Sequence, residues 1–129
     1  MVQPLEYASD GQARCSVLAA CRHFATERIE VDGAFRRPVN QQTFHILLSV
    51  SGEIMIGDGD SSMPLQPAQA LLVPGSSDRF EVVGNGVLLD YYVPDLHEDI
   101  VPRLLERGHT PGDIANLGVA TLATDIRIL

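Results

Sequence analysis

The sequence has few basic residues, and they form no cluster larger than a pair. Lysine and arginine together number 9 against 17 aspartates and glutamates, which gives a formal net charge of −8. The longest basic run is Arg36-Arg37. Nucleic acids and anionic membrane surfaces attract proteins through clustered positive charge, so this composition argues against both as partners.

Long hydrophobic runs and a secretion signal are also lacking. The apolar runs reach about eight residues, whereas a membrane-spanning helix needs roughly 20. Residues 1–11 do not show the basic start and apolar centre of a signal peptide. We therefore expect a cytoplasmic protein.

Cysteine is scarce, since the chain contains only Cys15 and Cys21. They are six residues apart and have no histidine or cysteine partners at the spacing of a zinc site. A redox pair would more often have the C-x-x-C spacing. We expect two reduced, partly buried thiols.

Short apolar segments separated by turn residues dominate the first 94 residues. Turn signals stand at Asp32-Gly33, Ser51-Gly52 and Gly84-Asn85-Gly86, and we predict that each separates two strands. Residues 1–10 are predicted to be irregular, and 13–20 fit either a strand or a short helical turn. Several short strands at this spacing predict an antiparallel sandwich or barrel. The predicted strands cover residues 24–31, 43–50, 53–57, 63–65, 71–73, 80–83 and 87–93.

The acidic segment Gly57–Ser62 has alternating aspartate and glycine, as calcium loops do. A full calcium loop needs about a dozen residues and a closing bidentate glutamate. Neither is present, so we predict a hairpin turn here.

The pattern changes to helical spacing after Pro94. One short helix is expected to begin at Asp99 and end at Gly108, and a second to begin with Thr110 as its cap and Pro111 at its first position. The apolar tail, residues 119–129, is expected to pack on a surface of this chain or of a partner.

The spacing of residues 33–52 resembles the first motif of the cupin superfamily, in which two glycines enclose a His-x-His pair and a glutamate. Gly33 and Gly52 occupy the glycine positions. A second cupin motif corresponds to residues 68–83, with Pro74 in place. The resemblance implies an all-β fold, the cupin double-stranded β-helix or jelly-roll barrel, here with two short C-terminal helices. The expected organisation is one domain over 1–129, with the barrel at about 13–94 and a helical tail at 95–129.

The metal ligands of these cupin motifs are mostly replaced in this chain. The motif positions hold Val39, Gln41, His45 and Arg79. Valine has no donor atom, and arginine stays protonated and cannot bind a cation. The resemblance therefore implies no bound metal and no cofactor.

The order of the segments narrows the resemblance to the C-terminal cupin domain of the type I mannose-6-phosphate isomerases, over about residues 14–95. In that family, zinc and the proton-transferring groups belong to a separate N-terminal domain, which this chain has no room for. The resemblance leaves enzymatic activity uncertain, with aldose-ketose isomerisation as the family activity. The matching residues are Phe24, His45, Leu47, Leu48, Gly52, Leu65, Val73 and Pro74.

His45, Arg79 and Gln41 are the candidate ligand-binding residues. The motif register predicts that His45 and Arg79 both point into the barrel mouth, where an imidazole and a guanidinium could hold a sugar phosphate. The alternative is that His45 is a hydrogen-bonded core histidine and Arg79 a surface residue in a turn.

Three functional hypotheses follow. The first is a metal-free, non-catalytic module that binds a sugar phosphate or supports assembly. The second is a ligand-sensing barrel like those of arabinose-type regulators, although no helix-turn-helix pattern follows. The third is isomerase activity together with a partner chain. Because cupins commonly associate through sheet edges, we also expect a homodimer.

Overall fold

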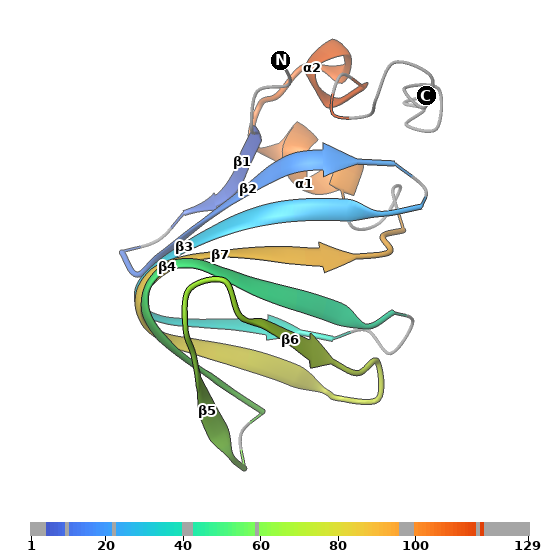
Figure 1. Cartoon of the computed structure of the whole chain (residues 1–129). Helices are drawn as coiled ribbons and strands as arrows, with labels where there is room; N and C mark the ends of the chain where they lie inside the picture. Colours follow the sequence, from blue (N-terminus) through green and yellow to red (C-terminus); the bar gives the residue numbers. More distant parts are fainter. Residues whose placement is uncertain are drawn as a thin grey trace.

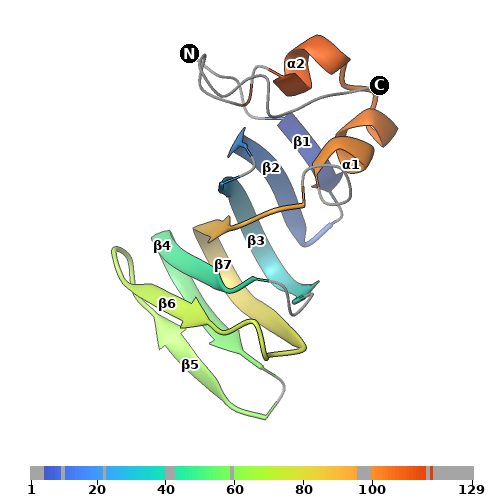
Figure 2. The ribbon, with the colours of Figure 1, turned by 90° about the vertical axis from the view of Figure 1, so that its right-hand side faces the viewer.

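The computed structural model describes residues 5–9, 11–21, 23–39, 43–58, 60–95, 100–115 and 117. Within these residues, seven strands form one antiparallel sheet in the order β1-β2-β3-β7-β4-β5, and β6 pairs with β4 beside this path. Two short helices lie at the end of the sheet next to β1 and β2 (Figures 1 and 2). None of the helices in the described part of the chain is long and apolar enough to cross a membrane. The elements are β1 (Leu5–Ser9), β2 (Ala13–Ala20), β3 (Ala25–Pro38), β4 (His45–Gly57), β5 (Ser62–Leu65), β6 (Ala70–Val73), β7 (Arg79–Tyr92), α1 (Val101–Glu106) and α2 (Pro111–Ala115).

The predicted all-β cupin architecture is confirmed, including the two short C-terminal helices. Residues 13–20 are a strand, which settles the alternative left open above. The prediction of an irregular lead-in over residues 1–10 was wrong, because Leu5–Ser9 pairs with β2 as an edge strand. Gly57 pairs with Ser62 across the acidic segment, as expected of a hairpin turn.

The three predicted turns at glycines were wrong, because each glycine lies inside one long strand. β3, β4 and β7 are 14, 13 and 14 residues long and continue through Gly33, Gly52 and Gly84. All three glycines have positive φ, and the register places Gly33 opposite Gly84 and Gly52 opposite Gly86. The three strands therefore bend together, and the sheet folds over on itself (Figure 1).

Close backbone contact at this corner requires glycine. A Cβ atom on Gly52 would lie 2.1 Å from the Asn85 carbonyl oxygen, and one on Gly84 would lie 2.2 Å from the Glu53 carbonyl oxygen. Real Cβ atoms do not approach so closely, and positive φ is also unfavourable for other residues. These glycines give the same local signal as a tight turn, but the strands on either side of them do not pair with each other.

The register of β4 shifts between Ser49 and Ser51. Before this bulge the buried positions are odd-numbered, at His45, Leu47 and Ser49, and after it they are even-numbered, at Ile54 and Ile56. The extra residue keeps apolar side chains on the inner face of both halves of the strand.

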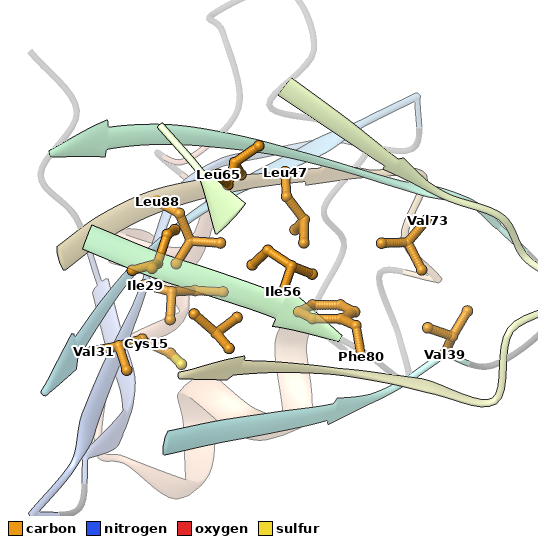
Figure 3. Packing of buried hydrophobic residues seen from close by; sticks show 12 residues of the cluster. Cys15, Ile29, Val31, Val39, Leu47, Ile56, Leu65, Val73, Phe80 and Leu88 are labelled. Atoms are coloured by element: carbon orange, nitrogen blue, oxygen red, sulfur yellow. The ribbon is translucent and has the colours of Figure 1, made fainter. Parts of the chain in front are cut away.

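The interior contains two apolar clusters. One lies between the two halves of the folded sheet, where Leu47, Ile56, Phe80 and Leu88 pack together (Figure 3). The other joins the helices to β1 and β2 through residues such as Val17, Leu104 and Ile114.

The helical tail is fixed to the edge of the sheet. The backbone N–H of Ala20 donates to the carbonyl of Leu117, and the Arg107 side chain donates to Glu6 Oε1 at 3.1 Å. Thr110 caps α2 by accepting from the Asp113 N–H at 3.2 Å, as predicted. The other predicted cap, Asp99, lies outside the described residues.

Candidate functional site

His45 lies inside the folded sheet at the start of β4, with only 5% of its surface exposed. Its Nδ1 is 2.8 Å from Asp90 Oδ1. Because an ionised carboxylate can only accept, Nδ1 carries a proton and donates it to Asp90. The ring stacks on Tyr92 at 5.0 Å between centroids and lies 5.5 Å from the Phe80 ring.

The cation beside His45 is Arg37 and not Arg79. Arg37 lies near the end of β3 and is 8% exposed. Its Nη1 donates to Asp90 Oδ2 at 2.7 Å, and its Nη2 donates to Glu27 Oε1 at 3.0 Å. Glu27 precedes the Gly33 corner on the same strand, so the ion pair connects the two halves of β3 across the fold.

Tyr92 completes this buried polar network by donating its hydroxyl proton to Glu27 Oε2. Both carboxylates, Glu27 and Asp90, are fully buried. Each charged side chain is thus paired, which offsets the large cost of removing charges from water. Such a set holds a structure together but has no free charge for a ligand. We refer to Glu27, Arg37, His45, Asp90 and Tyr92 as the buried network.

The prediction that His45 and Arg79 point together into one mouth was wrong. Arg79 begins β7 and is exposed, while its neighbour Phe80 is buried in the core. Side chains alternate faces along a strand, so Arg79 points away from the interior that contains His45. The alternative expectation for His45, a hydrogen-bonded core histidine, describes its position. Gln41, the third candidate, lies outside the described residues.

Arg79 instead borders a pocket of about 190 Å³ between β5 and β6. These two strands pair with different halves of β4, and no hydrogen-bonded register joins them. Ser61, Ser62 and Ser77 line the pocket, together with Asp58. Its apolar part is formed mainly by Leu71, Leu72, Val73 and Phe80.

Asp58 organises the turn beside this pocket. Its Oδ1 accepts hydrogen bonds from the backbone N–H groups of Asp60, at 3.0 Å, and Ser61, at 3.1 Å. These two donors lower the pKa of the Asp58 carboxyl below its ordinary value. Asp58 is therefore ionised at neutral pH and holds the serine-containing turn in place.

The described residues do not fit a transition-metal centre. At the cupin ligand positions, Val39 has no donor atom, Arg79 is a cation, and Nδ1 of His45 is bonded to Asp90. The two carboxylates near His45 already bind the Arg37 guanidinium. Within the described ranges no three histidine, cysteine, aspartate or glutamate side chains could hold a metal ion. That the protein binds no metal stays a prediction.

Sequence reasoning missed four members of the buried network: Glu27, Arg37, Asp90 and Tyr92. A signal was present, because Glu27 and Asp90 each occupy a position where the strand alternation predicts an inward side chain. An acid at such a position requires a buried partner. The same alternation, continued along β3 from Glu27 past Gly33, places the Arg37 side chain on the inner face as well.

The comparisons with known proteins agree with this architecture. The family model described as "Mannose-6-phosphate isomerase, cupin domain" matches residues 15–93. No curated protein matches the chain. The solved structures that resemble it do so at low sequence identity, so they support the fold alone.

Three solved structures illustrate the similarity. The mannose 6-phosphate isomerase of Bacillus subtilis has a TM-score of 0.61 and 14% identity, over 70% of this chain and 28% of that chain. An RmlC-like cupin from Shewanella frigidimarina has a TM-score of 0.62 and 22% identity, over 77% and 90%. Pac13, a nucleoside dehydratase from Streptomyces, has a TM-score of 0.61 and 15% identity, over 70% and 76%. The chain thus matches less than a third of the Bacillus enzyme's length.

Proposed function

Since this chain belongs to the mannose-6-phosphate isomerase cupin-domain family, we propose that it is a metal-independent, non-catalytic module that binds a small sugar phosphate in the pocket beside Arg79. The observation that carries the proposal is the placement of Arg79. It is an exposed arginine at a pocket that is also lined by three serines and by apolar residues. The buried network, by contrast, supports the fold.

Arg79 has the chemistry to bind a phosphate group. Within the described part of the chain it makes no ion pair, whereas Arg36 and Arg37 each bind a carboxylate. A guanidinium can donate two parallel hydrogen bonds to phosphate oxygens. The hydroxyl groups of Ser77 and Ser61 can donate further hydrogen bonds from the same pocket.

The remaining pocket residues suit a sugar ring. Phe80, Leu71 and Val73 offer apolar surface to the C–H groups of the ring. Asp58, which is ionised, also lines the pocket and can accept hydrogen bonds from sugar hydroxyls. Because a carboxylate repels a second anion, the phosphate would bind Arg79 and the hydroxyl groups of the sugar would bind Asp58.

The size of the pocket limits the ligand. Pockets for drug-sized molecules hold about 300–1,000 Å³, and this one holds about 190 Å³. A monosaccharide phosphate is the largest ligand that we expect it to enclose.

Titration calorimetry with mannose 6-phosphate, mannose and inorganic phosphate would test the proposal. We expect saturable binding of the sugar phosphate and a loss of about 10-fold or more in Arg79→Ala, because a charged two-pronged contact is removed. Arg36→Ala is the matched control, since Arg36 is also exposed but bonds to Glu81, outside this pocket. The proposal would be refuted if none of the three ligands gave saturable heat, or if the two variants lost the same amount of affinity for the sugar phosphate.

A second candidate function is proton transfer at His45, with or without a partner chain. The Asp90–His45 hydrogen bond favours it, because an oriented imidazole is the commonest general base. An isomerase assay of the wild type and His45→Asn would distinguish this from a binding role. Activity that disappears in His45→Asn while the affinity for mannose 6-phosphate is unchanged would favour catalysis.

A further inference from the structure

A groove of about 440 Å³ lies at the bend of the sheet and crosses β2, β3, β7 and β4. The bend is on the left in Figure 1. Ligand pockets commonly hold about 300–1,000 Å³, and this groove is larger than the pocket of about 190 Å³ beside Arg79, with which it shares no lining residue. We call it the outer groove. The polar side chains that line it are those of Gln12, Arg14, Glu30, Asp32, Ser51 and Asn85.

The strand register places the outer groove on the outer surface, between two cross-strand rows. The first row crosses all four strands and consists of Arg14, Glu30, Val87 and Ser51. In the second row Asp32 lies opposite Asn85, and both are exposed. The backbone of Gly86 and Gly52 lies between the rows. Because neighbouring strands are about 4.8 Å apart, a row over four strands is about 14 Å long. The groove therefore suits an extended ligand.

The fold holds the walls of the outer groove in place. Gln12 fixes one end, because its carbonyl accepts from the Asp32 N–H at 2.7 Å and its Oε1 accepts from the Ala34 N–H at 3.0 Å. β3 is paired with strands on both sides, and so is β7. Their backbone groups are therefore used within the sheet, so a ligand must be recognised by side chains and not as an added strand. A site that is already formed loses little entropy when it binds.

The side chains of Asp32, Ser51 and Asn85 are available for a ligand. All three are exposed, and within the described part of the chain they make no hydrogen bond or ion pair. A carboxylate accepts hydrogen bonds, while an amide and a hydroxyl both donate and accept them. Side chains directly opposite each other on paired strands have Cβ atoms about 5 Å apart, so Asp32 and Asn85 can both bond to hydroxyl groups of one sugar ring.

The charges in the outer groove argue against an anionic ligand. Arg14 is already paired, because its Nε is 3.2 Å from Glu6 Oε2 and its Nη1 is 3.9 Å from Glu30 Oε2. The Asp32 carboxylate repels phosphate and carboxylate groups, in contrast to the guanidinium of Arg79. We propose that the outer groove binds a linear, uncharged oligosaccharide, at a site separate from the Arg79 pocket.

Titration calorimetry of the full-length chain with mannohexaose, maltohexaose and cellohexaose would test the proposal. We expect at least one of them to bind with a dissociation constant of about 0.1–1 mM, and its monosaccharide to bind at least about 10-fold more weakly, because one ring makes fewer contacts. Asp32→Ala and Asn85→Ala should each weaken binding about 10-fold. Asp60→Ala is the matched control, since Asp60 is also exposed but lies outside the groove. Asp60→Ala and Arg79→Ala should change the constant less than about twofold.

Several results would overturn the proposal. If none of the three hexasaccharides gives saturable heat, or if hexalysine binds and they do not, the outer groove is not an oligosaccharide site. A loss in Asp60→Ala equal to that in Asp32→Ala, or a loss in Arg79→Ala alone, places the sugar elsewhere. Should the alanine variants fail to fold by circular dichroism, Ser51→Leu removes a hydroxyl and obstructs the groove from β4, and it should still weaken binding about 10-fold.

Discussion

Arg37 and Arg79 lie on paired strands, one register step apart, but they point to opposite sides of the sheet. Arg37 is opposite Phe80, and Pro38 is opposite Arg79. Arg37 is buried and holds Glu27 and Asp90, while Arg79 is exposed beside a pocket. The comparison shows that the face of the sheet on which an arginine lies determines its role. A charged side chain on the inner face must be paired with an opposite charge within the fold, whereas one on the outer face stays available to a ligand.

The largest effect that separates the two arginines should be on stability. Arg37→Ala leaves two fully buried carboxylates without their cation, and we expect the free energy of unfolding to fall by about 3–5 kcal/mol. Arg79→Ala should lower it by no more than about 0.5 kcal/mol, because this side chain is on the surface. Urea unfolding followed by circular dichroism measures both values.

Removing the carboxylates together with the arginine sharpens this test. Glu27→Leu/Arg37→Met/Asp90→Leu should recover part of the stability lost in Arg37→Ala, since no buried charge is left unpaired. If Arg37→Ala costs no more than Arg79→Ala, the buried network does not stabilise the fold and the contrast between the two arginines is false.

The next test concerns the bend of β3, β4 and β7 at Gly33, Gly52 and Gly84, which we call the glycine corner. It folds the Arg37 half of β3 over the Glu27 half, and Gly52 lies at the same corner in β4. Gly52→Ala should lower the free energy of unfolding by about 2–3 kcal/mol, because φ is +87° and the new Cβ meets the Asn85 carbonyl oxygen.

Gly11→Ala is the control for the corner, since no atom of the described residues would lie within 4 Å of a Cβ added there. Thermal unfolding of the two variants should show a clear loss for Gly52→Ala and a small change for Gly11→Ala. Equal melting temperatures would mean that the corner tolerates a side chain and that another feature bends the strands.

The fold was largely predictable because alternation and β-branched residues identify strands wherever one face is buried. The bend was not, since Asp32-Gly33 and Gly84-Asn85-Gly86 have the residues of tight turns. Positive φ allows a chain to reverse or a long strand to bend. Which of the two occurs depends on whether the flanking strands pair with each other or with distant strands, and local sequence does not contain that information.

The candidate site was predictable only in part for a related reason. His45 was identified from motif spacing, but its partner Asp90 is 45 residues away and is brought to it by the pairing of β4 with β7. Arg79 was assigned to the interior by the same spacing. The parity of β7 contradicts that assignment, because the buried residues Phe80, Val82 and Leu88 are all even-numbered.

Ser49 provides the smallest test of the rule that inward polar groups must be paired. It lies at the β4 bulge, is 1% exposed, and its hydroxyl has no hydrogen-bond partner among the described residues. Its backbone is satisfied, because its N–H donates to Gln69 and its carbonyl accepts from Ala68. Ser49→Ala removes only the unpaired hydroxyl, so the free energy of unfolding should rise by about 1 kcal/mol.

Thr43→Val is the matched comparison for Ser49→Ala. The Thr43 hydroxyl is also buried, but it donates to the Phe44 carbonyl and accepts from the Val93 N–H. Its removal should lower the free energy of unfolding by about 1 kcal/mol, because the Val93 N–H loses its acceptor. If urea unfolding shows a rise in the free energy of unfolding for Ser49→Ala and a fall for Thr43→Val, hydrogen-bond pairing determines whether a buried hydroxyl stabilises the fold. A loss of stability in Ser49→Ala as large as that in Thr43→Val would mean that the Ser49 hydroxyl has a partner, and that inward polar groups are paired throughout this region.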